Sequence, residues 1–150
     1  MTNRAELREN TAKGSCLCGK IAFSVSEFEP LVGHCHCTMC RKFHGAAFST
    51  FVEVKLENLT WLRGESELSS YQADNGSVRQ FCQHCGSSLV FISTFNKQAK
   101  TVEIALACFD TEPNVSPEAH IYLASKVRWY SPQDDLAKFQ RYRKTKCDPT

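Results

Sequence analysis

Seven of the nine cysteines stand in three short clusters, a spacing typical of metal-binding proteins. The clusters are Cys16-Leu17-Cys18, Cys35-His36-Cys37-Thr38-Met39-Cys40 and Cys82-Gln83-His84-Cys85. In an extended segment, side chains two residues apart point to the same side, so a Cys-x-Cys pair can place both sulfurs on one ion. A Cys-x-x-Cys pair does the same around a tight turn. Gly19 and Gly86 follow two of the clusters, where glycine relieves a tight backbone. The clusters therefore predict zinc.

The seven thiols divide naturally into a set of four and a set of three. A structural zinc takes four protein ligands in a closed tetrahedron, whereas a catalytic zinc keeps one position open for water or substrate. The first and third clusters, each followed by glycine, suit a closed site, and the middle cluster suits an open one. Spacing alone leaves two alternatives, namely a single zinc with spare thiols or a second site that a histidine completes.

The other histidines and cysteines are weaker candidates as ligands. His36 adjoins two of the thiols, but the alternation that aligns those thiols points its side chain the other way. His34 shares that phase and is expected to pack or hydrogen-bond, while His84 is expected to be a solvated turn residue. Cys108 lies in an apolar run and is expected to be buried without a metal role, because free cysteine behaves as a small hydrophobe. Cys147 is expected to be an exposed thiol of the polar tail.

Composition and charge exclude several classes of protein. A chain of 150 residues with 42% hydrophobic and 23% charged residues can form a sizeable core and does not resemble a disordered protein. The longest unbroken apolar run, residues 104–109, is too short to cross a bilayer, and residues 1–13 lack the apolar stretch of a signal peptide. A formal net charge of +2 gives no reason to expect a nucleic-acid partner. We expect a cytoplasmic protein, in which thiols stay reduced and bind metal.

Short strands are expected to position the clusters. Residues 21–26 alternate between apolar and small side chains, which is the period of a half-buried strand. Further strands are expected at residues 48–54, 59–62, 67–72, 77–81, 88–94, 101–109 and 120–125. Asp74-Asn75-Gly76 predicts a hairpin turn that leads into Cys82. A short helical turn is expected at residues 41–44.

One longer helix is expected near the C-terminus. Ser131 can cap it, Pro132 suits its first turn, and Leu136 and Phe139 share a face. The basic residues that follow are expected to form a solvated helix end rather than a nucleic-acid surface, since acidic residues precede them and no aromatic platform is evident. They are Lys138, Arg141, Arg143, Lys144 and Lys146.

No repeat or linker divides the chain, so a single domain is expected. Its predicted bounds are residues 13–142, with a polar N-terminal extension at residues 1–12 and a basic polar tail at residues 143–150. Arg41 and Lys42 adjoin the proposed open zinc. They are either ordinary surface charges or a means of attracting an anionic substrate, and the sequence favours neither alternative.

The three clusters in this order resemble the glutathione-dependent formaldehyde-activating enzyme family, which also includes centromere protein V. The motifs that carry the resemblance are Gly14-Ser15-Cys16-Leu17-Cys18-Gly19, Cys35-His36-Cys37-Thr38-Met39-Cys40-Arg41-Lys42 with Gly45, and Phe81-Cys82-Gln83-His84-Cys85-Gly86-Ser87. It continues through Asp110, Pro117, His120-Ile121 and Trp129, and covers roughly residues 13–140. Ala107 and Phe109 depart from the family's usual glycine and leucine, which concerns the substrate pocket rather than the metal ligands.

The resemblance implies a mainly β structure, a β-tent fold of antiparallel sheets pinned by two zinc ions per chain. Cys16, Cys18, Cys82 and Cys85 match the family's structural site, and Cys35, Cys37 and Cys40 match its catalytic site. The implied activity is that of a carbon–sulfur lyase resembling S-(hydroxymethyl)glutathione synthase, which joins the thiol of glutathione to formaldehyde or a related small aldehyde. An open three-thiolate zinc suits this chemistry, because it can lower the proton affinity of an incoming thiol.

A function of a different class is the alternative. The centromere-associated relatives suggest a zinc-stabilised binding module without catalysis. A long basic or disordered extension would favour that hypothesis, and we find none in this sequence.

Overall fold

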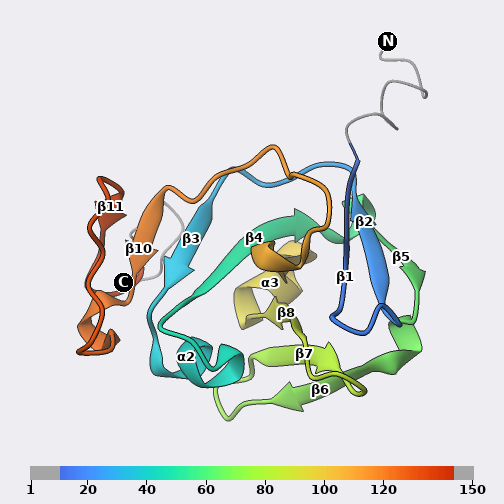
Figure 1. Ribbon diagram of the computed structural model, residues 1–150, viewed down its shortest axis with the longest axis horizontal. Coiled ribbons are helices and arrows are strands. Elements are labelled where there is room, and N and C mark those ends of the chain that lie inside the picture. The colour runs from blue at the N-terminus through green and yellow to red at the C-terminus, as the bar shows by residue number, and fades with distance from the viewer. Residues whose placement is uncertain (1–10, 144–150) are drawn as a thin grey trace. The chain divides into compact units, whose positions relative to one another are not determined.

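The computed structural model describes residues 11–143, which form two compact units. One unit comprises the described residues up to 31 together with residues 51–115. The other comprises residues 32–50 together with the described residues from 116 onward. Most of the described elements are strands, and residues 11–143 contain only two α-helices, so the expected mainly β fold is confirmed (Figure 1).

Two antiparallel arrangements of strands make up the first unit. The smaller sheet has the order β1-β2-β5 and consists of β1 (Ala12–Ser15), β2 (Ala22–Val25) and β5 (Leu59–Arg63). The larger arrangement has the order β4-β9-β8-β7-β6 and consists of β4 (Ser49–Lys55), β6 (Leu68–Gln72), β7 (Val78–Cys82), β8 (Ser88–Ile92) and β9 (Thr101–Ala105). Short 3-10 turns lie at η1 (Leu56–Asn58), η2 (Glu65–Glu67) and η3 (Leu106–Cys108). The expected strand at residues 101–109 is therefore shorter than predicted.

Hairpin turns bring the cysteines of this unit to strand ends. The expected turn at Asp74-Asn75-Gly76 is confirmed, since the Ala73 N–H donates to the Ser77 carbonyl over 2.9 Å. The β6–β7 pair that it closes runs in antiparallel register as far as Leu68 opposite Cys82. The turn thus fixes the register that delivers Cys82 to the end of its strand.

Apolar side chains of the short strands form the core of the first unit. Phe23 is fully buried on β2 and makes edge-to-face contacts with Trp61 and Phe109 at ring-centroid distances of 5.9 and 5.2 Å. Gly14 on β1 lies directly against this ring, and a Cβ there would come within 2.3 Å of Phe23 Cζ. Only glycine fits at this position, which lies two residues before Cys16.

Helix α3 (Thr94–Ala99) was not expected from the sequence. Its start is a capping box, in which the Ser93 hydroxyl accepts from the Asn96 N–H and the Asn96 side chain accepts from the Ser93 N–H. Asn96 is buried and also donates to Thr101 Oγ1 over 2.9 Å. Asn96 occupies the position at which a capping box usually has Glu or Gln. The sequence pattern therefore does not predict this helix start.

The second unit carries the middle thiol cluster. β10 (Ala119–Ile121) pairs in parallel with β3 (Val32–Cys35) and with β11 (Ala137–Lys138). Helix α2 (Thr38–His44) follows β3 and ends at Gly45, so the expected helical turn at residues 41–44 is confirmed and begins earlier than predicted. A 3-10 turn, η4 (Leu123–Ser125), follows β10.

The prediction of a C-terminal helix from Ser131 is wrong. Residues 131–133 have no regular secondary structure, residues 134–136 form bends, and the chain then pairs as β11. Asp134 explains the difference, because its Oδ1 accepts the Leu136 N–H over 3.1 Å and its Oδ2 lies 2.9 Å from His120 Nε2. Such side-chain bonds to nearby backbone compete with the helix. The Phe139 N–H then donates to the His120 carbonyl, which continues the extended pairing.

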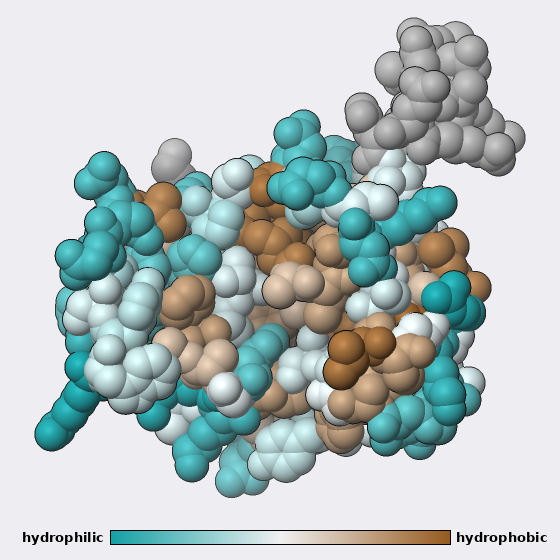
Figure 2. Space-filling model, viewed as in Figure 1, coloured by the Kyte–Doolittle hydropathy of each residue, from teal (hydrophilic) through white to brown (hydrophobic). Residues whose placement is uncertain are grey.

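The predicted extension and basic tail lie almost wholly outside the described residues, so the domain bounds stay a prediction. Among the described basic residues near the C-terminus, Arg143 pairs with Glu118 and Lys138 pairs with Asp134. No helix among the described residues is long and apolar enough to span a membrane. On the face drawn in Figure 2, hydrophobic residues occur in groups separated by hydrophilic ones.

Candidate metal centres

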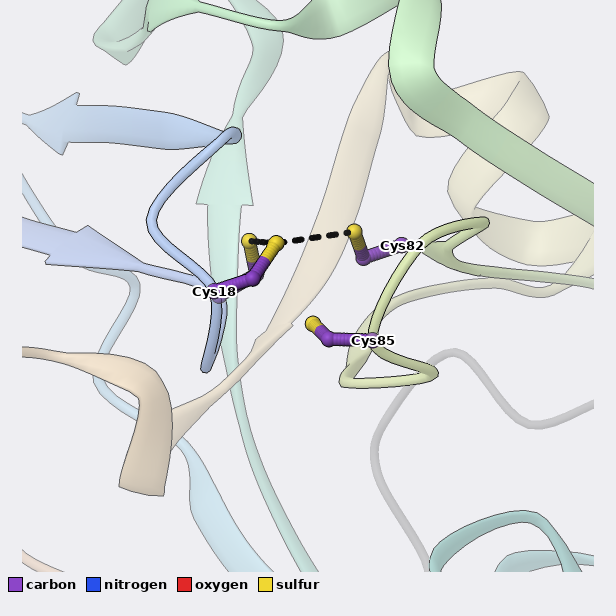
Figure 3. A group of neighbouring side chains, drawn as sticks. Cys18, Cys82 and Cys85 are labelled. Atoms are coloured by element: carbon purple, nitrogen blue, oxygen red, sulfur yellow. Dashed lines mark hydrogen bonds between the residues drawn. The ribbon is translucent and has the colours of Figure 1, made fainter.

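Four thiols of the first unit converge from the turns of two hairpins. Cys16 and Cys18 follow β1, while Cys82 ends β7 and Cys85 lies in the turn before β8. Their four sulfur atoms all lie within 4.8 Å of one another. The Cys18 sulfur is 3.6 Å from that of Cys16 and 3.8 Å from that of Cys82. Figure 3 shows the labelled side chains pointing toward one another from the two turns. The structure thus brings together the four residues that the sequence assigned to one site.

The backbone of each turn is shaped to present its pair of sulfurs. The Gly19 N–H donates to the Cys16 carbonyl over 3.0 Å, and the Gly86 N–H donates to the Cys82 carbonyl over 2.8 Å. Both glycines have a φ of 76°, in the left-handed region that other residues rarely adopt. The Leu17 N–H also donates to the Ser87 hydroxyl over 2.8 Å, which ties the two turns to each other.

His84 does more than the solvated turn residue that was expected. Its Nε2 lies 2.6 Å from Glu67 Oε2, and the Gln83 amide donates to the same carboxylate. The bond with His84 is the largest influence that holds the pKa of Glu67 below its usual value. These contacts brace the turn between Cys82 and Cys85 from outside.

Three thiols of the second unit form another cluster. Cys35 ends β3, Cys37 is the N-cap of α2, and Cys40 is buried in its first turn. Their sulfur atoms all lie within 4.8 Å of one another. The Cys37 sulfur accepts the Cys40 N–H over 3.3 Å. The short helix therefore folds the chain so that three thiols within six residues face one point.

Electrostatics favour a thiolate in both clusters. Hydrogen bonds from the thiol of Cys35 and, second in size, from the thiol of Cys40 lower the pKa of Cys37 to about 2. The same pairing raises the pKa of Cys35. In the four-thiol cluster, the Ser87 hydroxyl lowers the pKa of Cys85 to about 5. Thiolates are the form in which cysteine binds metal.

Both clusters fit a tetrahedral metal ion that is bound by sulfur. Four sulfurs at Zn–S distances of about 2.3 Å lie about 3.8 Å from one another in a regular tetrahedron. The measured separations of 3.6 and 3.8 Å in the four-thiol cluster are close to that value. The three-thiol cluster supplies three corners of such a tetrahedron, and no further Cys, His, Asp or Glu of residues 11–143 joins it. Each cluster could therefore hold a metal ion, one of them closed and the other open.

The histidines beside the three-thiol cluster face away from its sulfurs, as the alternation predicts. His34 Nδ1 lies 2.7 Å from the Thr50 hydroxyl, so its expected hydrogen-bonding role is confirmed. His36 is fully buried, and its Nε2 lies 2.8 Å from His120 Nδ1. Burial, followed by the nearby His120, lowers the pKa of His36 to about 4. Neither histidine is grouped with the thiols.

Cys108 is half-buried rather than fully buried as predicted. Its thiol donates to the Ser88 carbonyl over 3.5 Å, and burial followed by the charge of Asp110 raises its pKa to about 11. Cys108 is grouped with neither cluster, and its lack of a metal role stays a prediction. Cys147 lies outside the described residues.

Arg41 and Lys42 lie side by side in the sequence of α2 but have different surroundings. The Arg41 guanidinium donates to the Ser125 carbonyl over 2.5 Å, which ties α2 to η4. Lys42 is exposed. The Lys42 side chain is therefore freer to contact an anion than the Arg41 side chain, which already bonds the Ser125 carbonyl. The sequence did not distinguish the two residues in this way.

The sequence model of the glutathione-dependent formaldehyde-activating enzyme family matches residues 11–125, which include every clustered thiol. The chain belongs to this family. It is 27% identical over 119 residues to an uncharacterized lyase of Schizosaccharomyces pombe, a match that covers 79% of this chain and 82% of the relative. It is also 27% identical over 125 residues to a Halomonas elongata protein provisionally named a glutathione-dependent formaldehyde-activating enzyme, with 78% of each chain covered.

A solved structure shows the same fold as this member of the glutathione-dependent formaldehyde-activating enzyme family. A crystal structure of a Rhodobacter sphaeroides protein superposes with a TM-score of 0.56 and is 20% identical in sequence. The match covers 85% of this chain and 98% of the other. The mainly β arrangement is thus shared at low sequence identity.

Proposed function

We propose that the protein is a zinc-dependent enzyme of the carbon–sulfur lyase type that adds the glutathione thiol to formaldehyde or a related small aldehyde. The observation that carries this proposal is the open cluster of Cys35, Cys37 and Cys40, whose sulfurs converge in a chain of the formaldehyde-activating family. A three-thiol site with a free position is typical of a catalytic rather than a structural metal.

The two clusters would hold two zinc ions per chain, with different roles. Cys16, Cys18, Cys82 and Cys85 form a closed set that would join the turns of two hairpins and stabilise the fold. The three thiols of the second unit would form the catalytic site. Soft thiolate ligands in a tetrahedral arrangement select zinc over hard cations such as magnesium.

The chain's own residues would prepare the open site for a thiol substrate. The neighbouring thiols and the Cys40 N–H lower the pKa of Cys37, which favours the thiolate form that binds metal. A zinc ion held by Cys35, Cys37 and Cys40 would supply an open position at which an incoming thiol loses its proton more readily. Addition forms one carbon–sulfur bond at the carbonyl carbon, and the thiol proton ends on the carbonyl oxygen. Binding both partners at one place also accounts for part of the rate.

Arg41 and Lys42 are the proposed contacts for a carboxylate of glutathione, and their surroundings predict different outcomes. Lys42→Ala should raise the apparent KM for glutathione by roughly two- to fivefold at low salt, as expected for an exposed charge pair, and leave kcat unchanged. Arg41→Ala should raise KM and also loosen α2, because it removes the bond to Ser125. Lys55→Ala, an exposed lysine of the first unit, is the control. A KM that is unchanged in Lys42→Ala at every salt concentration would remove this residue from the site.

Metal content and exchange kinetics together test the proposed function. We expect two zinc ions per chain by elemental analysis, of which mild chelation removes one without unfolding the protein. Exchange NMR of glutathione and formaldehyde should show a rate above the uncatalysed reaction that disappears with this zinc. The rate of the uncatalysed reaction must be subtracted, because glutathione and formaldehyde also combine without an enzyme. A protein with both zinc ions and no rate above background would favour the alternative of a zinc-stabilised binding module. A cytoplasmic location and the absence of a nucleic-acid partner stay predictions.

A further inference from the structure

Ser87 is hydrogen-bonded to both of the turns that supply thiols to the four-thiol cluster. Its hydroxyl oxygen lies 2.8 Å from the Leu17 nitrogen and 3.3 Å from the Cys85 sulfur. Its carbonyl accepts the Cys82 N–H over 3.0 Å. Leu17 belongs to the turn between β1 and β2, whereas the other three residues belong to the end of β7 and the turn before β8. One side chain thus joins the two turns that Figure 3 shows facing each other.

The two partners of the Ser87 hydroxyl fix the direction of both its hydrogen bonds. The Leu17 N–H can only donate, so the hydroxyl oxygen accepts this bond with one of its lone pairs. A metal-bound cysteine is a thiolate, which carries no hydrogen and can only accept. When the cluster holds a metal ion, the Ser87 O–H is therefore the donor in the contact with Cys85.

The second turn does not need this hydroxyl in order to close. Its backbone bonds run from the Cys82 N–H to the Ser87 carbonyl and from the Gly86 N–H to the Cys82 carbonyl, over 3.0 and 2.8 Å. Any residue at position 87 has a carbonyl that could make the first of these bonds. The hydroxyl instead bonds the other hairpin and a proposed metal ligand. Its loss should therefore affect metal binding more than the turn itself.

We propose that Ser87 is a positioning residue of the four-thiol metal centre, whose hydroxyl donates to metal-bound Cys85 while it accepts the Leu17 N–H. This inference rests on the proposed function, which assigns a structural zinc to that cluster. Four thiolates give a bound zinc ion a shell of negative charge, and a donor to one sulfur stabilises that charge and orients the sulfur. The bond to Leu17 extends this constraint to the turn that carries Cys16 and Cys18.

Zinc affinity provides the first test. Ser87→Ala removes the hydroxyl and keeps the carbonyl, so it should weaken zinc binding at the four-thiol cluster about 10- to 100-fold, as the loss of a hydrogen bond to a metal ligand usually does. Ser87→Thr keeps a hydroxyl and should bind zinc as the parent does. Competition with a chelator of known affinity, after mild chelation has removed the zinc of the open cluster, measures the dissociation constant.

Ser15→Ala is the matched control for the affinity measurement. Ser15 also adjoins a thiol of the cluster, but its hydroxyl donates to the Asp110 carboxylate over 2.5 Å. The variant should therefore keep the zinc affinity of the parent. A loss as large as that in Ser87→Ala would mean that any serine near the cluster has this effect.

Cadmium-113 NMR provides a second test, which reports on the hydrogen bond itself rather than on stability. Thiolates also bind cadmium, a soft metal, so it can replace zinc in the four-thiol cluster. In the parent, at a temperature where hydroxyl exchange is slow, the cadmium of this cluster should couple to the Ser87 hydroxyl proton through the Cys85 sulfur. The Ile21 N–H, which donates to the Cys16 sulfur over 3.3 Å, is the internal reference for such a coupling. This test needs only the parent, so it holds even if Ser87→Ala does not fold.

Three outcomes would overturn the inference. They are equal zinc affinities of Ser87→Ala and Ser87→Thr, an equal loss of affinity in Ser15→Ala, and a parent in which cadmium couples to the Ile21 proton but not to the Ser87 hydroxyl proton. A parent that binds zinc in this cluster independently of Ser87 removes the inference and leaves the proposed function intact. A parent that binds no metal in this cluster removes both the inference and the proposed structural zinc.

Discussion

Cys82→Ser should lose one zinc per chain. The variant should already be unfolded at room temperature and show no cooperative unfolding transition on heating. Cys82 is fully buried where β7 meets the four-thiol cluster, so serine would replace a metal ligand with a hydroxyl and leave three thiolates facing one another. A structural zinc contributes about 10–16 kcal/mol in small zinc-dependent domains, which equals or exceeds the usual total stability of about 5–15 kcal/mol. Circular dichroism during heating, with elemental analysis of zinc, measures both effects.

Cys108→Ala is the matched control for this experiment. It also removes a thiol from the first unit, but Cys108 is half-buried and belongs to neither cluster. The expected loss is about 1 kcal/mol with unchanged zinc content, as for a small truncation. If Cys82→Ser melts as the parent does and retains all zinc, the four-thiol cluster is not a structural metal site.

Cys40→Ser should remove the metal of the second cluster without unfolding the protein. Cys40 is buried in the first turn of α2, and its loss would leave two thiolates, too few to hold zinc firmly in an open site. We expect a folded protein with one zinc per chain and an exchange rate of glutathione and formaldehyde equal to the uncatalysed rate. Elemental analysis, heating and exchange NMR on one preparation provide the three measurements.

Met39→Ala is the control for Cys40→Ser, because it changes an exposed neighbour on the same helix that supplies no thiol. It should keep both zinc ions and the exchange rate. The contrary outcome is that Cys40→Ser unfolds as thoroughly as Cys82→Ser. The middle cluster would then be structural, and the binding module would become the better hypothesis.

Short-range spacing in the sequence determined the candidate metal centres. A Cys-x-Cys or Cys-x-x-Cys pair places its own sulfurs within reach of one ion, whatever the rest of the chain does, because the backbone over three or four residues has few conformations. The turn at Asp74-Asn75-Gly76 was predictable for the same reason, since its residues tolerate the backbone that a tight hairpin requires. The mainly β fold followed from the alternation of side chains along short segments.

Long-range packing decides what short-range spacing along the chain does not fix. Cys18 and Cys82 are 64 residues apart, and their sulfurs meet only because two hairpins end at one place. The expected helix after Ser131 is replaced by irregular chain, bends and β11, because Asp134 bonds both Leu136 and a histidine that is 14 residues away. His36 and His120 are separated by 84 residues along the chain, and the pairing of β3 with β10 brings their rings within 2.8 Å of each other. Local secondary-structure propensity depends on residues that are close in the sequence. A buried polar side chain instead forms its hydrogen bond with whichever residue the tertiary structure places beside it.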